Sequence, residues 1–179
     1  MKNILTVALS VVVLSTACKK EVTELPPATQ TGANTFGAKV NGEFWVPQGF
    51  GPIPANDILE ARLLPNRDLY VHARNFSASP NEREFEIFLK GVRTPGTYPL
   101  NTTVSYPNTS VNYGYFVKRN ITPQNEWITS ATNTGSVTIT RIDTVALIVS
   151  GTFQFNALNI YNAPEPLSVT EGRFDIKIQ

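Results

Sequence analysis

The sequence predicts an all-β protein, an antiparallel β-sandwich or open barrel of about eight to ten strands that follows a signal peptide and a flexible tether. Short stretches of alternating apolar and polar residues recur from about residue 35 to the end, separated by Gly, Pro, Asn and Asp. No window shows a sustained helical period. The 179 residues are 41% hydrophobic and include 10 Phe, 6 Tyr and 2 Trp, enough for one domain with a sizeable core.

Residues 1–17 have the order of a signal peptide. Lys2 gives a basic start, the apolar run ILTVALSVVVL follows, and Ser15, Thr16 and Ala17 form a small-residue exit. A membrane-spanning helix needs about 20 apolar residues, so this run is too short to be one. We therefore expect an exported protein.

Cys18 is the only cysteine and directly follows that exit. The stretch LSTAC resembles the lipobox of bacterial lipoproteins, although Ser15 stands where the box usually has Leu. The resemblance implies that Cys18 is lipidated, with palmitate among its acyl chains, and becomes the first mature residue. The alternative is a secreted protein with an incidental cysteine, which would leave an exposed reactive thiol.

The segment 18–34 is expected to be a flexible tether behind the lipidated cysteine. Its sequence KKEVTELPPATQTGAN mixes Pro, Thr, Gly and charges without an apolar period. Sixteen such residues span at most roughly 50 Å. Removing residues 1–17 takes away one basic residue and leaves 14 basic and 14 acidic residues, so nucleic-acid binding is not indicated.

The all-β domain is expected over residues 35–179 and opens with two hairpins. FGAKV and EFWV flank Asn41-Gly42, a pair that suits a type I′ turn. ILEARLL and LYVHARN flank a turn at 65–68, and EREFEIFLKG follows. In these strands we place the polar residues on a solvated outer face, where Arg74 would pair with Glu84 or Glu86.

The second half continues the alternation. VNYGYFVK, GSVTITR, TVALIVSGTFQFNAL and SVTEGRFDIKIQ all read as strands. In the third of these we place Val145 and Leu147 on the same buried side as Phe153, with a bulge or bend at Gly151. The chain is expected to end within a strand.

Several of these pieces together resemble a family of small Bacteroidota lipoproteins that is classified as a domain of unknown function. They are FGAKVNGEFWVP, GTYPL, GSVTITRIDT, VSGTFQFNAL and VTEGRFDIKI. The resemblance covers most of residues 34–179 and implies an exported, lipid-anchored all-β domain. It implies no activity and no catalytic residues.

Catalytic groups are few. His72 is the only histidine, and Cys18 is assigned to lipid, so neither a nucleophilic triad nor a zinc site is expected. We predict no enzyme activity, no metal and no cofactor. The alternative is a hydrolytic enzyme on the same scaffold, for which Glu84 and Glu86 have an admissible spacing along a strand.

Aromatic residues in or beside loops are the main functional signal. Such rings stack on sugars or peptides, so we name them as candidate ligand-binding residues: Trp45, Tyr98, Tyr106, Tyr113, Tyr115 and Trp127. The alternative is that they close the ends of the sandwich. We therefore expect a binding or structural module with a glycan or protein ligand, and the oligomeric state stays open.

Asp143-Thr144-Val145 resembles the sequon for O-glycosylation of exported Bacteroidota proteins, which marks Thr144 as a candidate modification site. The lipid would attach the protein to the cell envelope. We expect it at the outer membrane, facing either the periplasm or the cell surface.

Overall fold

The fold is known from a computed structural model, which describes residues 22–49, 58–77, 81–119, 125–161 and 165–179. The described residues contain eleven β-strands and no helix, which confirms the all-β prediction. The strands are β1 (Thr35–Val40), β2 (Glu43–Trp45), β3 (Leu59–Leu63), β4 (Leu69–Asn75), β5 (Arg83–Leu89), β6 (Gly96–Leu100), β7 (Tyr113–Lys118), β8 (Glu126–Ile128), β9 (Gly135–Asp143), β10 (Ile148–Asn159) and β11 (Leu167–Lys177).

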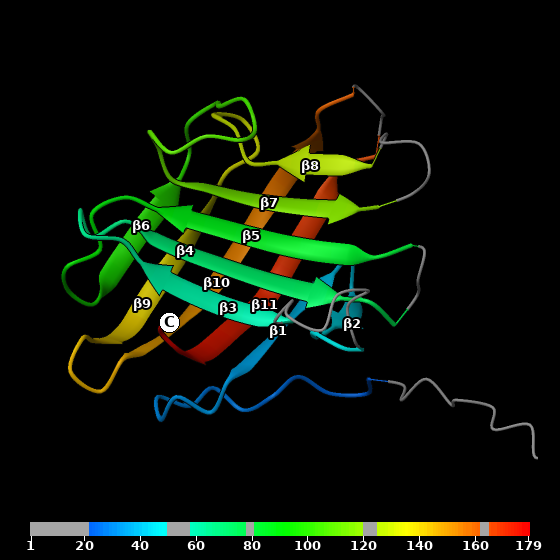
Figure 1. The fold of residues 1–179 in the computed structure, drawn as a ribbon. Coiled ribbons are helices and arrows are strands. Elements are labelled where there is room, and N and C mark those ends of the chain that lie inside the picture. The colour runs from blue at the N-terminus through cyan, green and yellow to red at the C-terminus, as the bar shows by residue number, and fades with distance from the viewer. Residues whose placement is uncertain (1–21, 50–57, 78–80, 120–124, 162–164) are drawn as a thin grey trace, which may run out of the picture.

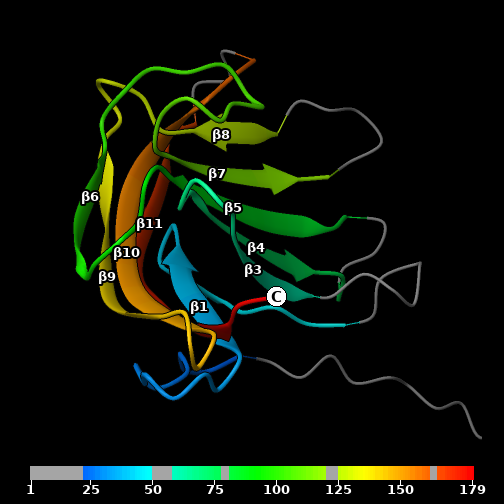
Figure 2. The same ribbon diagram turned by 60° about the vertical axis from the view of Figure 1, so that its left-hand side comes forward.

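The strands form one antiparallel sheet that curls into a half-barrel (Figures 1 and 2). The main path runs β2-β1-β11-β10-β8-β7-β5-β4-β3, and β9 pairs with β10 and carries β6 at its other edge. The long strand β10 forms the corner, because it pairs with β9 over most of its length and with β8 only at Leu158 and Asn159. Figure 1 shows β3, β4, β5, β7 and β8 as a layer that crosses in front of β10 and β11.

Both predicted hairpins are present. Asn41 and Gly42 have φ values of 49° and 86°, as a type I′ turn requires between β1 and β2. Strands β3 and β4 pair from Leu59–Ala73 to Leu63–Leu69. The alternating sequence therefore fixes which side chains of these strands face the core.

Two strands were absent from the sequence-based expectation, which explains why eleven are found rather than eight to ten. These are β6, which pairs along β9, and the three-residue β8, which pairs with β7 and with the end of β10. Both are short, and β6 contains a proline that lowers its strand signal. The partner of β6 lies far along the chain, whereas β8 pairs with the preceding strand β7 as well as with β10.

The start of β10 corrects a prediction. Residues 144–147 form the turn between β9 and β10, and Val145 is 94% exposed there, while Leu147 has a positive φ of 55°. They therefore do not belong to the buried face of the strand. The bulge expected at Gly151 is confirmed, since the β9–β10 register shifts between Ser150 and Gly151.

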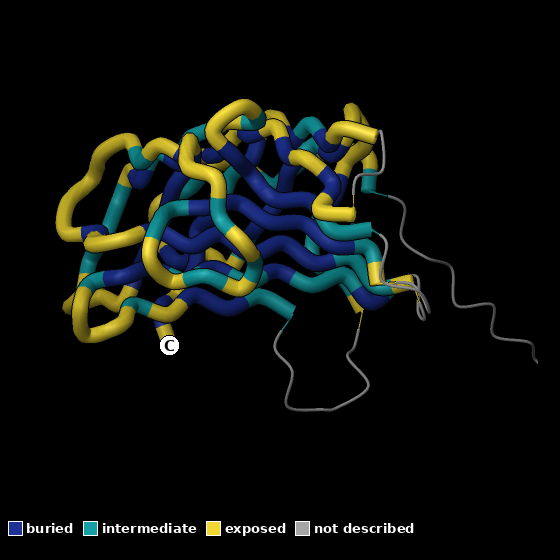
Figure 3. The backbone as a smooth tube through the Cα atoms, turned by 90° about the horizontal axis from the view of Figure 1, so that it is seen from above, coloured by how far each residue is buried: buried dark blue, intermediate teal, exposed yellow. Residues whose placement is uncertain are grey.

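The core lies between the two layers of the curled sheet. Figure 3 shows buried backbone through the middle of the molecule and exposed loops around it. Aromatic rings fill much of this space. Phe85 is central to them, with ring centroids 4.7 Å from Trp45, 4.8 Å from Phe116 and 5.4 Å from Phe36. Burial of these side chains is the main source of stability in a chain without a disulfide.

The end of the predicted tether lies against the domain. The carboxylate of Asp175 in β11 is 1% exposed and accepts hydrogen bonds from the hydroxyl of Thr29 at 2.6 Å and from the backbone N–H groups of Thr31 and Gly32, both at 2.8 Å. Ser150 in β10 donates to the same carboxylate at 2.7 Å. Residues 29–33 are therefore fixed to the sheet rather than free.

Cys18 and the signal-like residues 1–17 lie outside the described residues. In the part of the chain that the structure describes, no helix is long and apolar enough to span a membrane.

Candidate functional site

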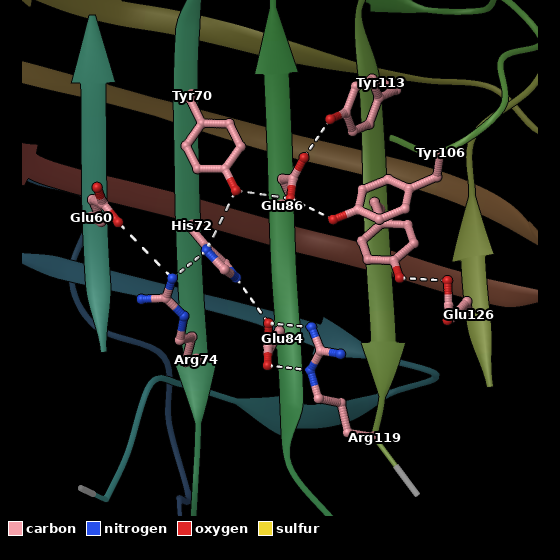
Figure 4. Close-up of polar contacts among 11 residues, drawn as sticks. Glu60, Tyr70, His72, Arg74, Glu84, Glu86, Tyr106, Tyr113, Arg119 and Glu126 are labelled. Carbon is pink, nitrogen blue, oxygen red and sulfur yellow. Dashed lines mark hydrogen bonds and ion pairs between the residues drawn. The ribbon is translucent and has the colours of Figure 1, made fainter. Parts of the chain in front are cut away.

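Polar side chains gather on the outer face of the layer formed by β3, β4, β5, β7 and β8. Figure 4 shows these side chains in front of the strands, with β1, β10 and β11 behind them, so they point away from the core. Successive residues of a strand point to opposite faces, and Phe85 and Ile87 therefore enter the core while Glu84 and Glu86 face outward. We call the following set the outer-face cluster: Glu60, Tyr70, His72, Arg74, Glu84, Glu86, Tyr106, Tyr113, Tyr115, Arg119 and Glu126.

Glu86 lies at the centre of the cluster. Its carboxylate accepts hydrogen bonds from the hydroxyls of Tyr70 at 2.9 Å, Tyr106 at 3.0 Å and Tyr113. Burial, together with the charge of Glu86, raises the pKa of each of these three phenols well above its ordinary value. The tyrosines therefore stay protonated and act as fixed hydrogen-bond donors.

Glu84 lies between a guanidinium and the imidazole. Arg119 contacts both carboxylate oxygens, Nε at 2.6 Å and Nη2 at 3.2 Å, and His72 Nε2 is 3.0 Å away. Burial raises the pKa of Glu84, but the hydrogen bonds from His72 and Arg119 outweigh it and lower the pKa to about 2. Glu84 is therefore ionised at neutral pH.

His72 uses both ring nitrogens inside the cluster. Its Nδ1 lies 2.7 Å from a guanidinium nitrogen of Arg74 and 3.5 Å from the hydroxyl of Tyr70, while Nε2 faces Glu84. The contact with Arg74 requires Nδ1 to accept, so Nε2 carries the proton in the neutral ring. Arg74 also lies 4.0 Å from Glu60, which forms an ion pair with Arg62.

The loop between β6 and β7 covers one end of the cluster. Tyr106 of this loop stacks on Tyr115 of β7, with ring centroids 3.8 Å apart and planes 4° from parallel. Tyr115 donates a hydrogen bond to Glu126 of β8 at 2.7 Å. Tyr115 belongs to a second apolar cluster, together with Phe88, Tyr113, Val117 and Ile128, and Tyr106 packs against this cluster.

The prediction that this face is solvated is wrong for its carboxylates. Glu60, Glu84 and Glu86 are only 5–6% exposed, because neighbouring side chains cover them, among them Tyr106 of the β6–β7 loop at Glu86. The β4–β5 register places Arg74 opposite Glu84, as the predicted cross-strand pair requires, and both side chains have further partners. Glu84 bonds to His72 and Arg119, and Arg74 lies near Glu60 and His72.

Three of the six candidate aromatic residues meet in the cluster, and the other three do not. Tyr106, Tyr113 and Tyr115 lie together on the outer face, but Tyr113 and Tyr115 are buried there, at 2% and 3% exposed, which contradicts their expected exposure. Trp45 and Trp127 are each 3% exposed and pack in the core, which contradicts their expected place at the surface. Tyr98 lies apart on β6, where its hydroxyl donates to the carbonyl of Thr94.

Two other predicted site residues lie away from the cluster. Thr144 is exposed in the β9–β10 turn, beside Asp143, which accepts hydrogen bonds from the backbone of Val145 and Ala146. Cys18 is outside the described residues. Within the described ranges, no group of three or more His, Cys, Asp or Glu side chains is placed to hold a metal ion.

Sequence reasoning missed Arg119, Glu126 and the role of the β6–β7 loop. Arg119 follows β7 and reaches Glu84 across the sheet, so its role depends on strand order rather than on local pattern. A signal for the cluster was present, since Tyr113 and Tyr115 share one parity in VNYGYFVK and Glu84 and Glu86 share one in EREFEIFLKG. The sequence pattern did not show that β5 pairs with β7, and this pairing is what brings the two sets of side chains together.

Comparison with family models gives one match, over residues 72–175, to a family described as a domain of unknown function (DUF6252). This stretch is more than half of the chain. The chain belongs to this family. Comparison with curated proteins and with solved structures finds no match.

The DUF6252 match confirms the predicted membership in an uncharacterised family. It begins at His72 and ends at Asp175, so it includes most of the outer-face cluster. The family description names no activity. Bacteroidota origin, lipidation and envelope localisation stay predictions.

Proposed function

We propose that this DUF6252 protein is a lipid-anchored module of the cell envelope, at the outer membrane, that binds a glycan on its outer-face cluster without turning it over. The signal-like start and the lone Cys18 support the anchor. The outer-face cluster supports binding. The single observation that carries the proposal is the convergence of carboxylates, guanidinium groups and tyrosines from distant parts of the chain on one sheet face.

The cluster offers the groups that polyhydroxylated ligands use. The side chain of Arg119 is 53% exposed, and that of Arg62, which lies beside the cluster as the ion-pair partner of Glu60, is 60% exposed. Their N–H groups can donate to sugar hydroxyls. Tyr106 is partly exposed and presents an aromatic ring for stacking on the apolar face of a sugar. Carboxylates outnumber guanidinium groups in the cluster, with Glu60, Glu84, Glu86 and Glu126 against Arg74 and Arg119, and this disfavours an anionic ligand.

Electrostatics favour binding over hydrolysis at this face. A glycosidase needs a carboxylic acid that holds a proton near neutral pH, yet the low pKa keeps Glu84 ionised. Glu86 is already bonded to three tyrosyl hydroxyls. Burying so many polar groups is costly compared with an apolar face, and a binding role accounts for that cost.

A glycan array tests the binding proposal. The wild type is compared with Tyr106→Ala, which removes the partly exposed ring, and with Tyr98→Ala, a matched control on the other part of the sheet. We expect wild-type signal to be retained by Tyr98→Ala and to fall about tenfold in Tyr106→Ala, the loss of one aromatic contact. Thermal melting verifies that both variants fold. Equal signals from the two variants would contradict a site at the cluster.

The anchor has a separate test. Cells are labelled with an alkyne-tagged palmitate, and the wild type is compared with Cys18→Ala. We expect label on the wild-type protein alone, together with accumulation of the uncut precursor in the presence of globomycin. A wild type that matures without label would contradict the lipid anchor.

A further inference from the structure

The described part of the N-terminal segment, residues 22–33, lies along the domain. Leu25 and Pro26 pack against β1 so closely that a Cβ built on Gly37 would lie 2.7 Å from Cδ of Pro26. Further along, the Asp175 carboxylate holds residues 29–33 through hydrogen bonds. The segment is thus fixed at two places, and Figure 2 shows it running beneath β1.

This segment forms one wall of a cleft at the seam of the half-barrel. As the sheet curls, β3 at one end of the sheet path comes back to β11. Two isolated bridges cross this seam: Ala61 of β3 pairs with Ile178, after β11, and Gln48, after β2, pairs with Asn75 of β4. The cleft at this seam has a volume of about 1060 Å³, near the upper end of the range for small-molecule sites.

The walls of the cleft combine an apolar part with polar side chains. The N-terminal segment contributes Leu25 and Pro26 to the apolar part, β1 contributes Phe36, and the segments after β2 and before β3 contribute Val46 and Ile58. The polar side chains of the lining are Thr23, Glu24, Asn34, Thr35, Gln48, Lys177 and Gln179. The apolar part suits a hydrocarbon chain, because burial of apolar surface is favourable without any polar partner.

The fixed segment shortens the tether greatly. Val22 lines the cleft, and Cys18 is four residues before it. Four residues reach at most about 14 Å, compared with roughly 50 Å for the sixteen-residue tether expected from the sequence. Any group attached to Cys18 therefore stays close to the cleft, at the high effective concentration that a short linker provides.

We propose that the seam cleft takes an acyl chain of the lipid carried on Cys18. This inference rests on the lipid anchor proposed above and adds a site for it within the domain. The cleft shelters one acyl chain whenever the anchor is not fully inserted in a bilayer, and it holds the seam side of the domain close to the membrane.

Photo-crosslinking in the full-length protein tests this inference. A benzophenone amino acid replaces Leu59, which lines the cleft, or Arg62, an exposed residue of the same strand that serves as the matched control. Gln48, another cleft residue, carries the probe in a third version in case the change at Leu59 prevents folding. The proteins are labelled with alkyne palmitate, purified in detergent, irradiated and digested for mass spectrometry.

We expect the probe at Leu59 or Gln48 to crosslink to the acyl chain of the Cys18 peptide, and the probe at Arg62 to give at least tenfold less product. A labelled protein without this crosslink would overturn the cleft inference and leave the anchor standing. Crosslinks to free membrane lipid or to a protein would also overturn it, because another occupant would then fill the cleft. An unlabelled protein would overturn the anchor itself.

Discussion

Asp175 shows how a single residue can organise distant parts of this chain. It has the parity of an outward-facing residue in RFDIKI, between Phe174 and Ile176, and the sequence gives no sign that it is buried. Its partners at residues 29–33 lie more than 140 positions away in the sequence, and Ser150 lies 25 positions away. Only the folded arrangement identifies this carboxylate as a structural centre.

We predict that Asp175→Asn lowers the free energy of unfolding by about 2 to 3 kcal/mol, because one oxygen becomes an NH₂ group that faces N–H and O–H donors. Chemical denaturation measures the change. Asp143→Asn, in the exposed β9–β10 turn, is the matched control and should cost clearly less. Equal losses in the two variants would show that the Asp175 contacts contribute little.

Acid should destabilise the protein through its paired carboxylates. The pKa of Glu84 is lowered to about 2 in the folded state from an ordinary value of 4.5, and the pKa of Asp175 is lowered well below its usual range. For both groups burial acts in the opposite direction, but hydrogen bonds outweigh it: those of His72 and Arg119 at Glu84, and those of Thr29 and Ser150 at Asp175. A lowered folded-state pKa gives stability that is present above the unfolded pKa and lost as the pH falls towards the folded pKa.

We therefore predict that the urea midpoint falls as the pH drops from about 4.5 towards 2, and that the fall is shallower in Glu84→Gln than in the wild type. Titration of the unfolding transition by fluorescence at several pH values measures this. The same slope in both proteins would mean that Glu84 gains no stabilising partner on folding.

At the level of elements, the sequence was most informative where alternation runs over several residues beside a clear turn signal. The β1–β2 and β3–β4 hairpins, the bulge at Gly151 and the strand at the C-terminus were all predictable from alternation and turn residues. Strands β6 and β8 were not, because β6 contains a proline and pairs with the distant β9, and β8 has only three residues. Because β8 was missed, Trp127 was placed near a loop rather than in the core.

Gly135 marks a place where two elements meet without room for a side chain. A Cβ there would lie 2.2 Å from Cβ of Phe155 and 2.4 Å from the carbonyl oxygen of Gln154. We predict that Gly135→Ala lowers the free energy of unfolding by about 1 to 3 kcal/mol, because the backbone of β10 must move. Thermal and urea unfolding measure the effect.

Gly96, at the start of β6, is the control for this change, because a Cβ there meets nothing within 4 Å. Gly96→Ala should be neutral or slightly stabilising. If both alanine variants unfold at the same urea concentration, the close packing of β9 on β10 is not a constraint on the sheet.

For the whole molecule, the fold class was predictable but the functional face was not. Alternation gave the outward direction of Glu84 and Glu86, yet their burial depends on side chains from distant parts of the chain: Tyr106 of the β6–β7 loop at Glu86 and Arg119 at Glu84. The curl of the sheet also creates the seam cleft, which no local pattern indicates. Both candidate sites arise from contacts between segments that are far apart in the sequence.

His72 provides the most direct test of the central claim, which is that ligands bind at the outer-face cluster. It is the only histidine, its side chain is 12% exposed, and it contacts Arg74 and Glu84. Its imidazole therefore gives one set of NMR signals that reports on the cluster alone. A glycan found on the array is titrated into the protein while these signals and the heat of binding are followed.

The account predicts a saturable shift of the His72 signals with the same Kd as the calorimetric titration. Calorimetric binding that leaves the His72 signals unchanged would contradict it and place the ligand elsewhere.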